Sequence, residues 1–267
     1  MTDVIPALEK IREEFKGKIR ENSGIIIGED WLLSSKSKIK KCLVTSRLTR
    51  KAVATAAKEE MQLIITIFSP VFTINKHRKI NKDNLDLLKI LLEKNIGVYS
   101  LGEEWVFAEN GGFDYLLKLL DFQYTAPLES KYQSLHKRSK TISGRLGERK
   151  NKITYKDLLE LLKQNINDKL CYLGYSQAKV QKIAMFHEIT DDFMEVIHEL
   201  KLDVILAGET SYEGLLTAQL QKLPLILLEK RTLENAMLAS IRRKLMEDVT
   251  ASLPEIISLK QDEIGSH

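Results

Sequence analysis

Residues 41–68 read KCLVTSRLTRKAVATAAKEEMQLIITIF and carry the clearest secondary-structure pattern in the chain. The apolar and β-branched residues within 41–48 favour a strand. Residues 50–61 are rich in alanine, which has the highest helix propensity. Residues 63–68 form a short apolar run that ends at a Ser-Pro pair, which indicates a buried strand. This succession predicts a strand–helix–strand unit whose two strands pair in parallel.

Other parts of the chain repeat the same alternation. Apolar residues recur with helical spacing in some segments, and short apolar runs bounded by polar residues mark others. The predicted strands cover 98–101, 180–186, 204–206 and 225–228, and the predicted helices cover 83–94, 190–200, 212–221 and 233–246. The pattern predicts an α/β fold with two lobes, in which mixed, largely parallel sheets are flanked by helices.

A polar, basic segment separates the two halves of the chain. Residues 124–154 are rich in Ser and Thr and are punctuated by Pro127, Gly144 and Gly147. We interpret this stretch as a connecting segment between an N-terminal lobe, residues 1–123, and a C-terminal lobe, residues 155–267. With 267 residues, 43% of them hydrophobic, the chain has enough apolar material for a sizeable core.

The overall composition excludes several classes of protein. Two cysteines imply no disulfide framework and indicate a reducing compartment, so we expect a cytoplasmic protein without a membrane partner. No apolar run is long enough to span a bilayer. The first 15 residues mix acids and bases and lack the apolar region of a secretory signal.

Two blocks of positive charge stand out against the mild net charge of +4. Residues 36–51 contain seven Lys or Arg and no acid, and residues 131–152 contain eight against Glu148 alone. Such blocks favour anionic partners, although a solvated face and a loop would have the same composition. The candidate nucleic-acid contacts are Lys131, Lys137, Arg138, Lys140, Arg149, Lys150 and Lys152.

Six short strings follow one another in an order and spacing shared with one known family. They are NSGIIIG at 22–28, QLIITIFSPVF at 62–72, GVYSL at 97–101, GRLGE at 144–148, AGETSYE at 207–213 and LILLEKRTLE at 225–234. The chain therefore resembles the Nif-three-like, or GTP cyclohydrolase 1 type 2 homolog, family. This resemblance implies a two-lobed α/β fold, a toroidal homo-oligomer and a pair of metal ions that activates water.

The matching positions in this chain depart from the family's metal ligands. The resemblance implies His, Asp and Glu ligands, of which Glu234 alone is retained. The other positions carry Ile67, Phe68, Gly102, Val106 and Lys230. Hydrocarbon side chains have no lone pairs to donate, and a protonated lysine repels a cation. We therefore predict a degenerate metal site without a cofactor, in which Lys230 pairs with Glu234 four residues on.

Two aromatic residues stand where the family presents residues that bear ligands. Trp105 and Phe107 have two interpretations. They either fill the emptied site or form an exposed anchor for a protein partner, because aromatic residues are common interface hot spots.

Three functional hypotheses remain open. The first is a catalytically inactive binding or regulatory factor associated with RNA or a ribonucleoprotein such as the ribosome. The second is a metal-dependent hydrolase with an altered ligand set, for which His187, Glu209, Glu213 and Glu234 are candidates. The third is a structural subunit that interacts with a paralogue retaining the ligands.

Overall fold

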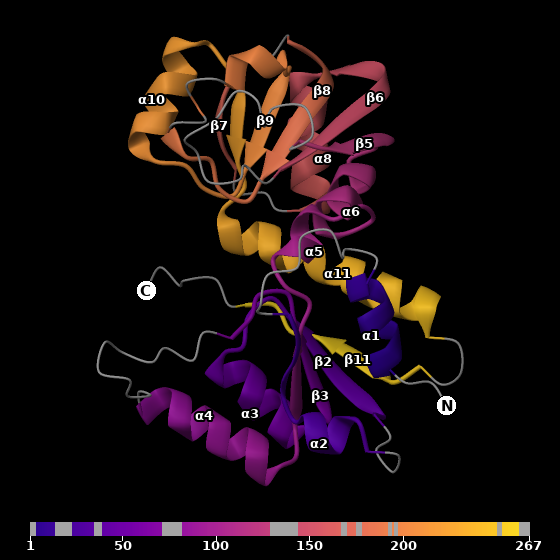
Figure 1. The fold of residues 1–267 in the computed structure, drawn as a ribbon. Coiled ribbons are helices and arrows are strands. Elements are labelled where there is room, and N and C mark those ends of the chain that lie inside the picture. Colours follow the sequence, from indigo (N-terminus) through magenta and orange to yellow (C-terminus); the bar gives the residue numbers. More distant parts are fainter. Residues whose placement is uncertain are drawn as a thin grey trace. The chain divides into compact units, whose positions relative to one another are not determined.

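The computed structural model describes residues 4–13, 23–34, 39–70, 82–128, 144–166, 170–174, 178–191, 194, 197–249 and 253–261 (Figure 1). The chain divides into two compact units. Unit 1 comprises Met1–Val106 and Leu238–His267, and unit 2 comprises Phe107–Met237. Each unit has its own sheet.

The sheet of unit 1 has five strands in the order β1-β4-β3-β2-β11. β4, β3, β2 and β11 are parallel, and β1 is antiparallel to β4. The elements are α1 (Val4–Glu13), β1 (Gly24–Ile27), α2 (Glu29–Leu32), β2 (Lys41–Thr45), α3 (Arg50–Lys58), β3 (Leu63–Thr66), α4 (Lys82–Glu93), β4 (Gly97–Ser100), α5 (Glu104–Phe107) and β11 (Glu255–Ser258).

Helices cover both faces of this sheet. Leu43, Ile64 and Val98 pack with buried residues of α3 and α4 in one apolar cluster. Tyr99 alternates with Val98 along β4, so it points to the opposite face. Its hydroxyl donates to Glu9 Oε1 of α1 at 3.0 Å, which places α1 on that second face.

The sheet of unit 2 has six strands in the order β5-β6-β8-β9-β10-β7. β8, β9 and β10 are parallel, and the remaining neighbours are antiparallel. The elements are α6 (Gly112–Leu119), β5 (Tyr124–Pro127), β6 (Gly144–Thr154), α8 (Tyr155–Asn165), β7 (Cys171–Leu173), β8 (Lys179–Phe186), the 3-10 helix η1 (Ile197–Leu200), β9 (Val204–Ala207), α10 (Tyr212–Leu220), β10 (Leu225–Leu227) and α11 (Lys230–Asp248), within which the two units divide.

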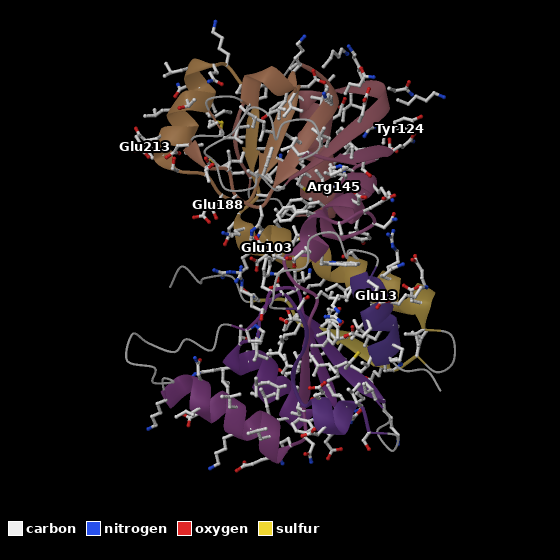
Figure 2. The ribbon with its side chains drawn as sticks, in the orientation of Figure 1. Glu13, Glu103, Tyr124, Arg145, Glu188 and Glu213 are labelled. Carbon is white, nitrogen blue, oxygen red and sulfur yellow. The ribbon has the colours of Figure 1, made fainter. Side chains whose placement is uncertain are left out.

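A buried ion pair ties α6 to β6. Arg145 donates from Nε and Nη2 to the two carboxylate oxygens of Asp114, each at 2.7 Å. The side chains are 3% and 1% exposed, and Asp114 also accepts the backbone N–H of Asn110 at 2.8 Å. Figure 2 labels Arg145 within unit 2. This pair is a structural anchor of the unit.

The predicted fold class is confirmed. Residues 41–68 form the parallel unit β2–α3–β3, with Cys42 opposite Leu63. Residues 124–154, interpreted as a connecting segment, instead supply β5 and β6. Within the described part of the chain, no helix combines the length and apolar character needed to cross a membrane.

The glycines in β6 explain why this segment did not look like a strand. A methyl group on Gly144 would lie 2.8 Å from a ring carbon of Phe186, and one on Gly147 would lie 2.8 Å from a methyl of Leu117. These glycines permit close packing. In the sequence alone they look like loop punctuation.

Candidate functional site

Polar side chains gather at the carboxyl edge of the unit 2 sheet. His187 and Glu188 follow β8, Glu209 follows β9, and Lys230 opens α11 shortly after β10. Because β8, β9 and β10 are parallel, their carboxyl ends meet at one edge. In open α/β sheets, this edge is where ligands bind.

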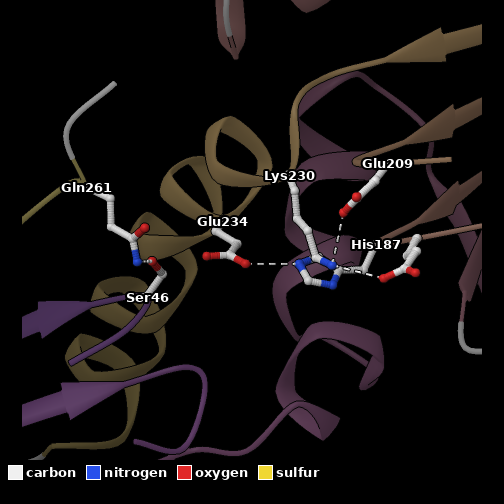
Figure 3. Close-up of polar contacts among 7 residues, drawn as sticks. Ser46, His187, Glu209, Lys230, Glu234 and Gln261 are labelled. Atoms are coloured by element: carbon white, nitrogen blue, oxygen red, sulfur yellow. Dashed lines mark hydrogen bonds and ion pairs between the residues drawn. The ribbon is translucent and has the colours of Figure 1, made fainter. Parts of the chain in front are cut away.

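The ammonium of Lys230 is held by two carboxylates. Its Nζ lies 2.9 Å from Glu188 Oε2 and 3.3 Å from Glu209 Oε2 (Figure 3). Partial burial lowers the pKa of Lys230, but the hydrogen bonds and charges of Glu188 and Glu209 outweigh this and raise the pKa above its ordinary value. Lys230 therefore remains a cation at neutral pH.

A second pair lies deeper at the same edge. His187 Nε2 and Glu234 Oε1 are 3.1 Å apart, and their side chains are 7% and 3% exposed (Figure 3). The prediction that Lys230 pairs with Glu234 is wrong. Helical spacing allowed that pair, but neighbours from other segments supply closer partners for both residues.

Gly208 lets these segments approach closely. A methyl group at this position would lie 2.6 Å from the carbonyl oxygen of His187 and 3.1 Å from the Cα of Lys230. A side chain here would push apart the two segments that carry the polar residues. Gly208, which follows β9, is therefore required for the close approach of the segments that carry the polar residues.

In unit 1, the predicted degenerate positions are largely closed to solvent. Ile67 and Val106 are fully buried, and Phe68 is 8% exposed, which confirms its predicted burial. The guanidinium of Arg47 lies 4.2 Å from the centroid of the Phe68 ring. Gly102 has a φ of +88°, a left-handed conformation that favours glycine.

Trp105 does not form an exposed anchor, and Phe107 is partly exposed. Trp105 exposes no surface, and its Nε1 donates to Ser240 Oγ at 3.2 Å within unit 1. Phe107 is half-buried and meets Phe113 edge to face, with ring centroids 5.4 Å apart. This burial contradicts the exposed-anchor interpretation of Trp105 and favours the alternative in which it fills the interior.

The basic candidates fall into three groups. Lys131, Lys137, Arg138 and Lys140 lie outside the described residues. Arg149 is anchored, because it donates to Leu120 O at 2.7 Å and to Asp121 Oδ2 at 2.6 Å and lies over the Phe122 ring. Lys150 and Lys152 are exposed on β6.

Sequence reasoning missed how the polar residues pair. Glu188 and Glu209 were not identified as partners of Lys230, and His187 and Glu234 were grouped as candidate metal ligands but not as a hydrogen-bonded pair. The available signal was positional. His187, Glu188 and Glu209 each lie within three residues of the end of a predicted strand, and the parallel arrangement brings such positions together.

The family model for Duf34/NIF3 (NGG1p interacting factor 3) matches residues 1–263. The chain belongs to this family. One relative, the GTP cyclohydrolase 1 type 2 homolog of Clostridium perfringens, is 25% identical over 215 residues, which cover 79% of this chain and 78% of that protein.

Solved structures show the same fold. Reduced HcgD from Methanocaldococcus jannaschii superimposes with a TM-score of 0.76 and 22% identity, covering 98% of both chains. The Bacillus cereus protein related to NIF3 gives a TM-score of 0.74 at 14% identity, covering 100% of this chain and 98% of that one. The Duf34/NIF3 fold is thus kept at low sequence identity.

Proposed function

We propose that this Duf34/NIF3 chain is a binding or regulatory factor that works without the family's metal pair. The observation that carries the proposal is the ammonium of Lys230 between Glu188 and Glu209. The resemblance places a metal-binding histidine at Lys230. A cation held there repels a divalent metal ion. It also occupies the two carboxylates that would otherwise attract the metal ion.

The remaining donor set supports the same conclusion. Ile67, Phe68 and Val106 offer hydrocarbon where the resemblance expects imidazole or carboxylate ligands. Glu234 is retained, but one of its oxygens faces His187. Within the described ranges, no three His, Cys, Asp or Glu side chains are grouped so as to hold a metal ion. These residues do not fit a pair of divalent cations.

One observation favours the alternative of a metal-dependent hydrolase with an altered site. His187, Glu209 and Glu234, three of the four candidate ligands, come from the same edge of the unit 2 sheet. Glu213 is exposed in the first turn of α10. For this alternative to hold, Lys230 would have to leave Glu209 so that the carboxylate could face a metal ion.

RNA or a ribonucleoprotein such as the ribosome is the first partner class that we propose. Clustered lysine and arginine bind phosphate backbones by releasing condensed counterions. A protein partner, including another copy of the chain or a paralogue that retains the metal ligands, is the second class. The cytoplasmic location remains a prediction from cysteine usage.

Calorimetric titration of the metal-stripped chain with Mn²⁺, Fe²⁺ and Zn²⁺ tests the proposal. We expect no stoichiometric binding by the native chain. Lys230→His returns an imidazole beside Glu209 and serves as the matched variant, with Lys156→His on the exposed surface as its control. Two tightly bound equivalents per native chain would contradict the proposal and support the hydrolase alternative.

A further inference from the structure

Lysines line the amino edge of the unit 2 sheet, opposite the polar site. β6 is antiparallel to β8, so the end of β6 lies beside the start of β8, with Thr154 opposite Lys179. The parallel strands β9 and β10 begin at the same edge. We define the lysine edge as Lys152, Lys156, Lys179, Lys182, Lys201 and Lys222.

Backbone hydrogen bonds join the segments that carry these lysines. Tyr155 N donates to Ala178 O at 2.8 Å, which brings the start of α8 to the start of β8. Asp203 N donates to Lys182 O at 2.8 Å, and Ile205 N donates to Pro224 O at 2.9 Å. The row therefore crosses β6, β8, β9 and β10. These four neighbouring strands are separated by three inter-strand distances, which add up to about 14 Å at the usual strand spacing.

The acids at this edge are already bonded to the backbone. Asp157 closes a capping box with Thr154 at the start of α8. Asp203 Oδ2 accepts the backbone N–H groups of Gln181 and Lys182 at 2.8 and 2.7 Å. Over the described ranges, no residue of the lysine edge forms an ion pair, so its positive charge is not neutralised by salt bridges to other described side chains.

Two of the lysines lie close enough to Asp157 for their charges to act on its carboxylate. The pKa of Asp157 is lowered first by its hydrogen bonds to Thr154 and further by the positive charges of Lys179 and Lys156. Five of the six lysines are exposed, and Lys182 is half-buried with its Nζ 3.2 Å from Leu200 O. The carboxyl edge, by contrast, carries Glu188 and Glu209. In unit 2 the amino edge thus carries the six lysines with Asp157 and Asp203, and the carboxyl edge carries Glu188 and Glu209 with Lys230.

We propose that the lysine edge binds the phosphodiester backbone of single-stranded RNA, an inference that rests on the RNA partnership in the proposed function. A row of lysines along a sheet edge suits a linear polyanion, and ammonium groups contact phosphates without reading bases.

An aromatic residue near this edge favours nucleic acid over other polyanions. Tyr172 is 50% exposed, and its ring centroid lies 6.3 Å from that of Tyr155, which opens α8. An exposed ring beside a phosphate track offers a surface on which an unpaired base stacks. Arg149 is not part of this surface, because the end of α6 already holds its guanidinium.

Binding of a fluorescent single-stranded oligouridylate, followed by anisotropy over a range of salt concentrations, tests the inference. In the quadruple variant Lys152→Gln, Lys156→Gln, Lys179→Gln and Lys201→Gln, we expect the slope of log affinity against log salt to fall by about 3, at about 0.7 for each lost phosphate contact. Tyr172→Ala should weaken binding and leave the slope unchanged, because stacking releases few counterions.

The matched control removes four exposed lysines of unit 1, namely Lys58, Lys82, Lys94 and Lys260. It changes the net charge by the same amount and should keep the native slope. Equal slopes in the native chain and the lysine-edge variant would overturn the inference, as would equal losses in both quadruple variants. Binding by the native chain to anionic lipid vesicles but not to RNA would also overturn it. These outcomes are independent of metal content, so the metal-free proposal stands or fails separately.

Discussion

At the scale of single residues, Arg145 and Asp114 show how charges become part of a protein core. Both side chains are almost fully buried, and two parallel hydrogen bonds satisfy the guanidinium and the carboxylate. Removing one partner leaves the other charge buried without compensation, which is more destabilising than removing both.

Arg145→Ala should lower the free energy of unfolding by about 3–5 kcal/mol, because Asp114 would lose its buried partner. Urea denaturation measures the change. The double variant Arg145→Met with Asp114→Leu should recover much of the loss. Lys163→Ala, which removes a half-exposed pair with Glu160, should change stability by about 0.5 kcal/mol or less. A loss below that of the Lys163 control would contradict the structural role of Arg145.

Phe68 tests whether a predicted ligand position has become part of the core. Its side chain is 8% exposed, so Phe68→Ala should cost about 3–5 kcal/mol of stability through lost burial and a cavity. Phe68→Leu keeps most of the volume and should cost less. Thermal and urea unfolding of both variants measure these stability changes. An alanine variant as stable as the native chain would show that Phe68 does not pack.

The residue scale also marks where sequence reasoning succeeded and failed. Burial of Ile67 and Phe68 was predictable, because hydrocarbon at these positions has no favourable place in water. The hydrolase hypothesis placed His187 and Glu234 at one site, but their direct contact was not predicted, because they are 47 positions apart and meet through tertiary packing. The four-residue helical spacing predicted Lys230 as the partner of Glu234, and this prediction is wrong.

At the scale of elements, the start of α8 is fixed by a capping box. Thr154 accepts the backbone N–H of Asp157 at 3.1 Å, and Asp157 Oδ2 accepts that of Thr154 at 3.1 Å. Thr154→Ala should therefore lower the free energy of unfolding by about 1 kcal/mol. Thr154→Ser keeps the acceptor and is the control. Equal stability of the alanine and serine variants would contradict the cap.

Asp157 makes the cap sensitive to acid. Hydrogen bonds to Thr154 lower the pKa of Asp157 from 3.8, so the carboxylate stabilises the fold above that pH. This contribution is lost as the pH falls below 3.8 through the lowered value. The stability difference between the native chain and Asp157→Asn should be constant near neutral pH and shrink in that acidic window. A difference that grew on acidification would contradict the assignment.

Elements differed in how visible they were in the sequence. β2 and β3 were predicted because they are short runs of apolar and β-branched residues, and α3 was predicted because it is rich in alanine. β5 and β6 were missed because many of their side chains are polar and exposed, and because Gly144 and Gly147 resemble turn residues. Their strand pairing depends on packing against residues distant in sequence, Leu117 and Phe186.

At the scale of the whole molecule, a net charge of +4 conceals strong local differences. In unit 2, glutamates and a lysine paired with them occupy one edge of the sheet, and six lysines that form no ion pair with other described residues lie at the opposite edge with Asp157 and Asp203. Family membership was recognisable from six short motifs and is shown by the match over residues 1–263. The motifs did not reveal which charges meet, because that depends on strand order.

Elemental analysis of the chain, purified without chelators, tests the central proposal most directly. With Lys230 between Glu188 and Glu209, and with hydrocarbon at Ile67 and Phe68, we predict well under one transition-metal ion per chain. Stoichiometric zinc, iron or manganese that survives dialysis would contradict the proposal.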